Sequence, residues 1–261
     1  MSTSRVLFDV QGSVARVTVN RPEARNAMTL DMYDAVVDAC ERVDADPAVR
    51  VLVIRAAGGR AFVSGTDIAA FSTFASREDG LAYERRLDAI VDRLERVRAV
   101  TIAQVEGVAA GGGCLLAFVC DLRVCTPAAR FGVPVARTLG NCLSAANYAR
   151  LIDLLGPARV KDLLLTARLM PAAEAQAIGL VNRLVDPPEI DQAVNDLATT
   201  LAAHAPLTIW ATKELVRRIQ ASRRSAAVQE ADVIGACYSS EDFREGVAAF
   251  LSKRPPRFTG R

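Results

Sequence analysis

Three consecutive glycines, Gly111–Gly113, stand directly before an apolar stretch of helical character, CLLAFV. Glycine weakens a helix, so a triplet at a helix start needs a physical reason. The residue type indicates that some other group comes too close to this backbone to allow side chains. The stretch that follows carries no acid or base before Asp121. A fold for this chain must therefore present a closely approached, uncharged helix start.

Apolar runs and amphipathic segments alternate around this triplet. Strands are expected at 13–20, 49–57, 100–107 and 120–127. The nearly continuous apolar runs are typical of strands buried on both faces, as in parallel sheets. Helices are expected after Thr29, which can cap the first of them, and over 81–99. The order of strands and helices predicts an α/β fold with crossover connections.

The chain becomes mostly helical from about residue 141. One helix is expected to end at Gly156, before Pro157, and another runs from Pro171 to Gly179. The segment LVNRLVDPP predicts a strand. Two or three helices are expected over 189–220 and 225–252.

Composition excludes several classes of function. A net charge of +2 with 51% hydrophobic residues gives no argument for nucleic acid or a membrane surface. Six cysteines without a CxxC pair and the single His204 argue against a metal site, and buried free thiols are expected. Cys142 has no neighbouring base that would make it a nucleophile. The start of the chain lacks the apolar stretch of a secretory signal, so we expect a cytoplasmic protein.

Six segments in order resemble the crotonase superfamily, the enoyl-CoA hydratase/isomerase family. They are NRPEARNAMT, GRAFVSGTDI, VEGVAAGGGCLLAFVCDLRV, ARFGVP, TARLMPAAEAQAIGLVNRLV and EDFREGVAAFLSKRPPRF. The resemblance implies a spiral of ββα units, with an acyl-CoA-binding core over 1–195 and a C-terminal helical trimerisation region over 196–261. It also implies a homotrimer or a dimer of trimers, and coenzyme A as part of the substrate with no further cofactor. The glycine triplet matches neither a GxGxxG fingerprint nor a Walker A motif.

The resemblance gives the glycine triplet a chemical purpose. It implies that the backbone N–H groups of Thr66 and Gly112 hold the oxyanion of a thioester, with the helix N-terminus adding its positive end. One such donor is worth roughly 3–4 kcal/mol in acyl-transfer enzymes. The alternative is that the glycines only allow tight packing of a helix on a strand.

The resemblance also implies a coenzyme A site along one edge. Arg25 and Ala27 would line the pantetheine and phosphates, and Lys253 would reach phosphates, in one version from a neighbouring subunit. The border of the adenine would be formed by Ser64, Gly65, Asp67 and Ile68. The alternatives are solvated surface charges for Arg25 and Lys253 and a turn-stabilising role for Asp67.

Two positions depart from the hydratases of this family. The resemblance places one catalytic glutamate two residues after the triplet and another after the FG-x-P stretch. Here these residues are Leu115 and Val135, and a one-residue shift of the alignment would place Ala136 at the second position. None of these side chains can hold or activate water. Either other groups perform the proton transfer or the standard hydration does not occur.

Other side chains are candidates for the missing groups. Arg137 could bind a substrate carboxylate or form a structural ion pair. Asn141 and Ser144 could orient a water or cap the following helix. Glu84, on the helix expected to cover the acyl pocket, could act as the base, and a surface charge is its alternative. Glu106, at a strand end, carries the same two interpretations.

Three functional hypotheses remain open at this stage. The first is an acyl-CoA enzyme of the hydratase/isomerase type, with decarboxylation, isomerisation, C–C cleavage or thioester hydrolysis as alternatives to hydration. Decarboxylation needs no base to form the enolate. The second is a coenzyme A thioester-binding protein without catalysis. The third is RNA binding, but the arginines of YERRLDAIVDRLERVR are interleaved with acids, which is typical of a solvated helix face.

Overall fold

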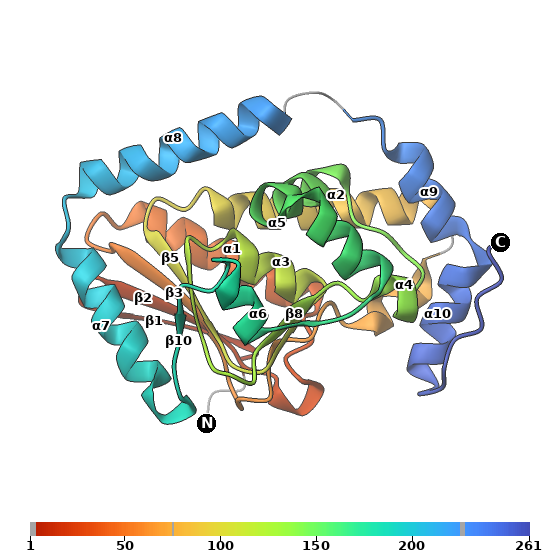
Figure 1. Ribbon diagram of the computed structural model, residues 1–261, viewed down its shortest axis with the longest axis horizontal. Helices are drawn as coiled ribbons and strands as arrows, with labels where there is room; N and C mark the ends of the chain where they lie inside the picture. The colour runs from red at the N-terminus through yellow and green to blue at the C-terminus, as the bar shows by residue number, and fades with distance from the viewer. Residues whose placement is uncertain (1–3, 75, 225–227) are drawn as a thin grey trace.

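The computed structural model describes residues 4–74, 76–224 and 228–261, and this part of the chain is built on two sheets (Figure 1). The larger sheet has the order β1 (Val6–Gln11), β2 (Val14–Val19), β3 (Val51–Ala56), β5 (Val100–Val105), β7 (Leu122–Cys125), β10 (Arg183–Leu184). The smaller sheet has the order β4 (Ala61–Val63), β6 (Val108–Ala110), β8 (Arg130–Gly132), β9 (Met170–Pro171). Neighbouring strands are parallel except in the pairs β1–β2 and β8–β9.

Successive segments repeat one ββα pattern. The helices of these units are α2 (Arg77–Glu95), α3 (Gly112–Val119) and α5 (Ala145–Leu165), the last preceded by the short α4 (Val135–Thr138). The strand pairs before them are β3–β4, β5–β6 and β7–β8, and each pair gives one strand to each sheet. The expected α/β spiral of ββα units with a helical C-terminal region is confirmed.

The remaining elements frame this repeat. They are η1 (Pro22–Ala24), α1 (Leu30–Ala45), η2 (Ile68–Thr73), α6 (Ala172–Ala177) and η3 (Pro187–Glu189), followed by α7 (Ile190–Ala203), α8 (Pro206–Arg224), α9 (Ala231–Ser239) and α10 (Glu241–Leu251). The C-terminal part thus holds four helices in its described residues, where two or three were expected. Residues 225–227, the start of the last expected helical segment, lie outside the described residues.

The sequence expectations fail where elements are short or irregular. The four strands expected first are present, but β4, β6 and β8 have three residues each, too few for a recognisable alternation. Gly156 does break the helix, with φ 74°, but the chain resumes helical geometry from Pro157 within α5. Thr29 occupies the N-cap of α1, yet its side chain makes no capping hydrogen bond.

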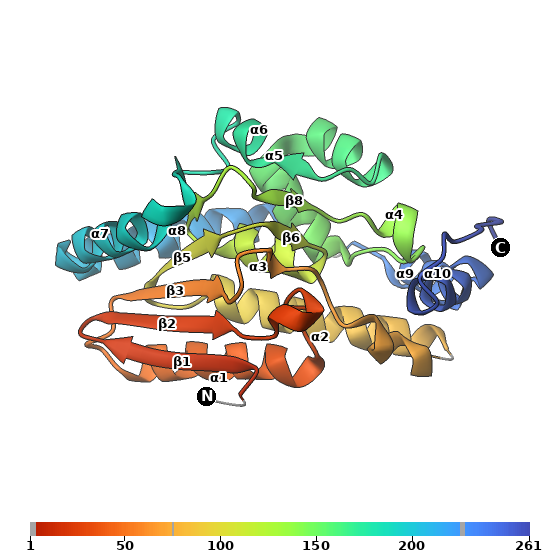
Figure 2. The ribbon, with the colours of Figure 1, turned by 90° about the horizontal axis from the view of Figure 1, so that it is seen from below.

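Both faces of the larger sheet are covered. Side chains of α7, including Ile190, Val194 and Leu197, pack with Val53 and Ile102 on one face. The main core lies on the opposite face, between the strands and α1, α2 and α3. Figure 2 shows β1, β2, β3 and β5 side by side in this sheet.

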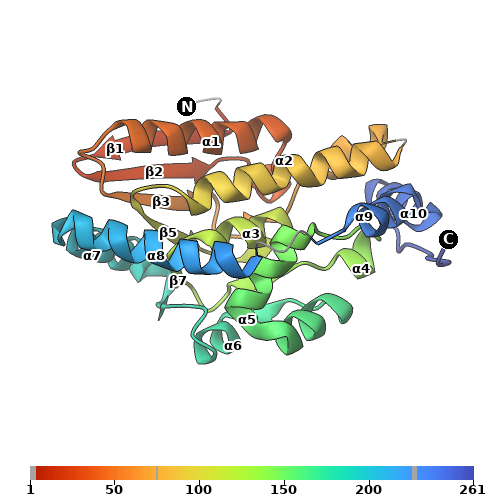
Figure 3. The ribbon, with the colours of Figure 1, turned by 90° about the horizontal axis from the view of Figure 1, so that it is seen from above.

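The last two helices return to the N-terminal end of α2. Figure 3 shows α9 and α10 beside this end, and both helices contact α2 or η2. At this junction Gly80 lies under the ring of Tyr238, because a Cβ on Gly80 would be 2.3 Å from Cγ of that ring. Segments more than 150 residues apart in sequence therefore build one wall.

The N-terminus of α3 packs directly onto β4. A Cβ placed on Gly113 would lie 2.2 Å from the backbone oxygen of Val63, closer than any side chain can come. Close packing of the helix on the strand therefore explains Gly113. This was one of the two interpretations of the glycine triplet. All eight residues of α3 are buried.

A buried arginine holds the other end of α3. Arg123, on β7, is 5% exposed. Its guanidinium donates to the carbonyl oxygens of Ala117, Phe118 and Cys120 at 3.2, 3.2 and 2.6 Å, and to that of Leu180 at 2.6 Å. These bonds satisfy carbonyls that the end of a helix otherwise leaves without partners. In the described part of the chain, no helix is both long and apolar enough to cross a membrane.

We expect the substitution Arg123→Met to lower the free energy of unfolding by about 2–4 kcal/mol, because buried carbonyls lose their donors. The control is Arg168→Met, which removes a surface arginine that bridges Asp162 and Glu174. Its cost should stay below about 1 kcal/mol. Urea unfolding of both variants measures the difference, and equal costs would contradict the capping role of Arg123.

Candidate functional site

Two backbone amides meet at the start of α3. Gly111 precedes the helix with φ 53°, and a parallel bridge to Met28 holds Thr66 beside it. A Cβ on Gly112 would lie 3.7 Å from Oγ1 of Thr66, so the two residues are neighbours. Within the described chain, the amides of Thr66 and Gly112 donate to no protein acceptor. Such a pair at a helix N-terminus can bind an anionic oxygen.

Two tyrosine hydroxyls flank Thr66. The Tyr33 hydroxyl lies 3.1 Å and the Tyr83 hydroxyl 2.7 Å from Oγ1 of Thr66. A Cβ on Gly112 would be 2.3 Å from the Tyr33 hydroxyl, so this oxygen lies directly against the helix start. Burial raises the pKa of Tyr33 to about 12 and that of Tyr83 well above its usual value. Both hydroxyls therefore stay neutral and keep their protons at physiological pH.

The two positions at which the resemblance implies glutamates carry apolar side chains here. Leu115 is 1% exposed within the main core, and Val135 is partly buried against that core. Ala136, the alternative in a shifted alignment, is exposed. Proton transfer from these positions is chemically excluded.

A carboxylate is buried one helix away. Glu84, on α2, is 1% exposed, so its interpretation as a surface charge is wrong. One of its oxygens accepts the Ser144 N–H at 2.9 Å, and the other accepts the Tyr238 hydroxyl at 2.5 Å. Glu84 thus connects α2 with the start of α5 and with α9.

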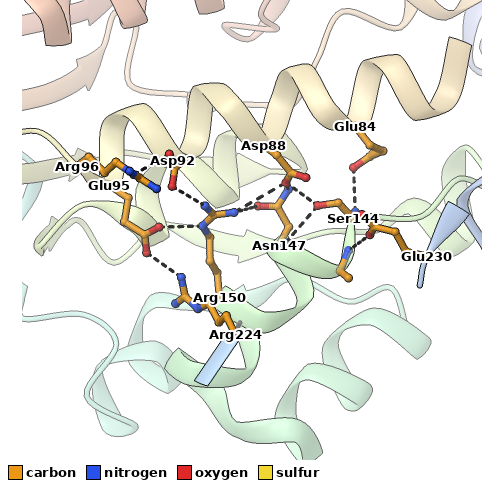
Figure 4. Close-up of polar contacts among 11 residues, drawn as sticks. Glu84, Asp88, Asp92, Glu95, Arg96, Ser144, Asn147, Arg150, Arg224 and Glu230 are labelled. Atoms are coloured by element: carbon orange, nitrogen blue, oxygen red, sulfur yellow. Dashed lines mark hydrogen bonds and ion pairs between the residues drawn. The ribbon is translucent and has the colours of Figure 1, made fainter. Parts of the chain in front are cut away.

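A polar network continues from Glu84 along α2 (Figure 4). Asp88 accepts hydrogen bonds from the Ser144 hydroxyl at 2.5 Å and from Nδ2 of Asn147 at 2.8 Å. Arg150 lies between Asp88 and Glu95, at 3.8 and 3.0 Å. Ser144 also caps α5 by accepting from the Asn147 N–H, which agrees with the capping interpretation of that residue. Among the described residues, no group of three or more His, Cys, Asp or Glu is arranged to hold a metal ion.

The surroundings of Glu84 favour its neutral form. Burial is the main cause and raises the pKa of Glu84 to about 7. The Tyr238 hydrogen bond lowers this pKa, while the charge of Asp88 raises it; the Ser144 amide lowers it and the charge of Glu230 raises it. Burial also raises the pKa of Asp88, against the effect of Ser144. Glu84 can therefore exchange a proton near neutral pH.

The segment between α4 and α5 supplies one contact to this site. Asn141 donates from Nδ2 to the Tyr238 hydroxyl at 3.0 Å, and its buried Oδ1 has no partner in the described chain. Arg137 is exposed on α4 and forms no ion pair with any described residue. A hydrogen bond between Cys142 and Cys237 raises the pKa of the first thiol and lowers that of the second to about 7.

Aromatic rings close the region between these groups. Tyr83 and Tyr238 have ring centroids 6.3 Å apart. Phe71 lies 4.9 Å from the ring of Tyr83, and Phe243 lies 4.9 Å from that of Tyr238. These rings come from η2, α2, α9 and α10, so the wall requires the C-terminal helices to be in place.

Arg25 and Asp67, two of the residues expected along the coenzyme A edge, have different surroundings. Arg25 is exposed and lines a surface pocket of about 190 Å³ together with Arg60 and Gly58. Asp67 pairs with Arg21 at 2.7 Å and accepts the Ala69 N–H at 3.1 Å, which matches its turn-stabilising interpretation.

The other residues of this edge surround the same loop. Ala27 accepts a hydrogen bond from Arg21 through its carbonyl, and the Ser64 N–H donates to the carbonyl of Arg25 at 3.3 Å. Gly65 and Ile68 are buried beside them. Lys253 is exposed after α10, and no described hydrogen bond or ion pair joins it to this loop.

Sequence reasoning missed the tyrosines. The chain has four, and Tyr33, Tyr83 and Tyr238 all place buried hydroxyls at this site. Tyr83 could have been found, because it adjoins the candidate Glu84 on one helix. Tyr238 had no local signal, since only the return of α9 to α2 brings it to Glu84.

Comparison with known proteins gives one consistent result. Residues 9–261 match the family model described as Enoyl-CoA hydratase/isomerase. A crotonyl-CoA hydratase from Syntrophomonas wolfei is 35% identical over 262 residues, covering 99% of each chain. A crystal structure of an enoyl-CoA hydratase/carnithine racemase from Magnetospirillum magneticum has 34% identity and a TM-score of 0.80, over 100% of this chain and 97% of that one. A methylmalonyl-CoA decarboxylase in complex with 2-nitronate-propionyl-CoA has 27% identity and a TM-score of 0.88, over 100% of both chains.

The raised pKa of Glu84 predicts a pH-dependent stability. The folded chain keeps this proton up to about pH 7, whereas the unfolded chain loses it near the ordinary pKa of 4.5. Stability relative to the Glu84→Gln variant should therefore fall as pH rises through this window, by an amount on the order of 2–3 kcal/mol.

Urea unfolding at several pH values measures this difference. The control is Glu78→Gln, which changes an exposed residue of the same helix. A difference between wild type and Glu84→Gln that stays constant from pH 4.5 to 7 would contradict the raised pKa.

Proposed function

The chain belongs to the enoyl-CoA hydratase/isomerase family, and on that premise we propose that it is an enzyme that forms a thioester enolate from an acyl-CoA substrate. The observation that carries the proposal is the pair of amides without protein acceptors, on Thr66 and Gly112. The thioester carbonyl oxygen accepts both N–H groups and takes up negative charge as the enolate forms. Each donor contributes roughly 3–4 kcal/mol to the stability of that charge.

The surroundings of the amide pair favour this charge. The helix α3 directs its positive end at the same point, and its first turn is buried away from water. The neutral Tyr33 and Tyr83 hydroxyls hold Thr66 in place through Oγ1. The donors are thus fixed before the substrate arrives, which is the condition for a large electrostatic effect.

Standard two-glutamate hydration is not the reaction that we propose first. Leu115 and Val135 give no carboxylate to activate water between two oxygens. Reactions that need the oxyanion site but a different proton-transfer group are isomerisation and decarboxylation of an acyl-CoA.

Decarboxylation is the second candidate, and a specific observation favours it. Loss of carbon dioxide leaves the electron pair of the broken C–C bond on the enolate, so no base is required. Arg137, exposed without an ion pair among the described residues, supports recognition of a substrate carboxylate. The likeness to a methylmalonyl-CoA decarboxylase supports the same candidate.

Coenzyme A is proposed to lie along the loop from Arg25 to Ile68. Arg25 and Arg60 offer positive charge beside a pocket, which suits phosphate. Asp67 contributes through the shape of the loop, since its carboxylate is occupied by Arg21. Lys253 would serve phosphates only from a neighbouring subunit or after a rearrangement of the chain end. No cofactor is required beyond the coenzyme A of the substrate.

The homotrimer or dimer of trimers also remains a proposal. It is supported by α8, which has no buried residue and carries exposed apolar side chains. These are Leu207, Trp210, Leu215, Val216 and Ile219.

A panel of three thioesters tests the proposed function. It contains crotonyl-CoA for hydration, but-3-enoyl-CoA for isomerisation and methylmalonyl-CoA for decarboxylation. We expect turnover of but-3-enoyl-CoA or methylmalonyl-CoA that exceeds hydration of crotonyl-CoA by at least tenfold. Coenzyme A binding with no turnover of any thioester would instead support the non-catalytic binding protein.

The proposed coenzyme A site makes its own prediction. The substitution Arg25→Met should weaken coenzyme A binding about tenfold, because one charge-assisted contact to phosphate is lost. Isothermal titration calorimetry measures this, with Arg85→Met on the exposed side of α2 as the matched control. Equal affinities of the two variants would place the phosphates elsewhere.

A further inference from the structure

We propose that Tyr238 and Glu84 form a proton-transfer pair in which the Tyr238 hydroxyl reaches the substrate carbon and Glu84 stores the proton. This inference rests on the proposed function and supplies the group that Leu115 and Val135 lack. It is carried by one contact, the hydrogen bond of 2.5 Å from the Tyr238 hydroxyl to Oε1 of Glu84.

The geometry assigns the contact with substrate to Tyr238. Both oxygens of Glu84 are occupied, one by Tyr238 and the other by the Ser144 N–H. Glu84 and Tyr238 are both buried, at 1% and 3% exposed, so the assignment rests on these hydrogen bonds. The phenol is the only partner of Glu84 within the described residues that can both accept and donate a proton.

The pair lies next to the proposed oxyanion site. The Tyr238 ring is 6.3 Å, between centroids, from that of Tyr83, whose hydroxyl contacts Oγ1 of Thr66 at 2.7 Å. Thr66 is the residue whose amide would hold the thioester oxygen. The Tyr83 side chain therefore contacts Tyr238 through its ring and Thr66 through its hydroxyl, which places the pair beside the proposed oxyanion site.

Asn141 gives independent support for a ligand at this position. Its Nδ2 donates to the Tyr238 hydroxyl oxygen at 3.0 Å, and a donor there stabilises negative charge on the phenol as the proton moves. Its Oδ1 is buried and has no partner in the described chain. Buried polar atoms in proteins are nearly always paired, so this oxygen points to a missing hydrogen-bond donor.

The proton transfer balances without any further reactant. Glu84 begins as the carboxylate; the Tyr238 oxygen takes the proton from the α-carbon as its own proton passes to Oε1 of Glu84. The electron pair of the broken C–H bond moves into the enolate, whose oxygen lies against the amides. The reverse transfer returns a proton from Tyr238 to carbon while Glu84 gives its proton to the phenol oxygen. After decarboxylation this second half alone is required, and Glu84 then begins as the acid.

The charges around Glu84 suit this exchange near neutral pH. Asp88 on α2 and Glu230 before α9 disfavour the carboxylate, and the Ser144 amide at the start of α5 favours it. Arg150 pairs with Asp88 rather than with Glu84, and its positive charge lowers the pKa of Asp88. The charge of Glu84 raises the pKa of the Cys142 thiol.

The test is the exchange of α-protons of butyryl-CoA with D₂O, followed by NMR. This partial reaction needs the oxyanion site and a base. Deuterium enters the carbon when the proton on the Tyr238 oxygen has been replaced from solvent, directly or by way of Glu84, before the reverse transfer. Tyr238→Phe keeps the ring and removes the hydroxyl, and Glu84→Gln removes the charge. The matched control is Glu78→Gln, which changes an exposed residue of the same helix as Glu84.

We expect Tyr238→Phe and Glu84→Gln each to lower kcat of exchange by at least 100-fold, with KM changed less than about threefold. The double variant should lose little more than either single variant, because the two residues act as one unit. In wild type, kcat should rise with pH through about 7. In Tyr238→Phe the residual rate should lose this pH dependence, because Glu84 then has no hydroxyl through which to act.

Three outcomes overturn the proposal, and they differ in what else they remove. Exchange at wild-type rates in both variants removes the proton-transfer pair and leaves the proposed function intact. A lower rate with an unchanged pH profile, or with KM rising in step, assigns Tyr238 to packing only. No exchange of any thioester by the wild type, together with no turnover in the panel, removes both. Thermal unfolding of each variant shows whether it folds. If Tyr238→Phe does not fold, the exchange rate of Glu84→Gln alone decides the question.

Discussion

The approach of α3 to β4 at van der Waals contact is the constraint on which the candidate site depends. Gly113 has no room for a side chain against the Val63 carbonyl, and Arg123 holds the opposite end of the helix through its carbonyls. The helix cannot slide along its axis without losing one of these contacts. The amides of Gly112 and Thr66 are consequently fixed next to each other, whether or not a ligand is present.

The ionisable side chains of the candidate site lie on other elements than α3. Leu115, where the resemblance implies an acid, extends the core, and the buried carboxylate lies on α2, as Glu84. A buried carboxylate is costly unless it is hydrogen-bonded, and Glu84 receives two donors from segments far apart in sequence. Burial then keeps its pKa near neutrality rather than near that of an exposed acid. The C-terminal helices thus complete the polar surroundings of Glu84 as well as the packing.

Sequence patterns predicted the elements whose structure depends on residues close to one another in sequence. Continuous apolar runs gave β3, β5 and β7, and Gly156 marked a real break. The second sheet escaped detection because three-residue strands are stabilised by neighbours distant in sequence, not by their own pattern. Glu84 looked like a surface charge among the charges of its helix, since nothing local shows that α9 covers it. The assignments to Thr66, Gly112 and the coenzyme A edge came from resemblance and stay predictions.

A crystal structure with an unreactive acyl-CoA thioether or ketone analogue would test the central claim most directly. For a ketone analogue, the account predicts the carbonyl oxygen at about 2.7–3.1 Å from both the Thr66 and the Gly112 nitrogen. It also predicts the α-carbon on the side of the Tyr238 hydroxyl. A carbonyl oxygen bound elsewhere, with the two amides covered by water or by the Tyr33 hydroxyl, would contradict the account.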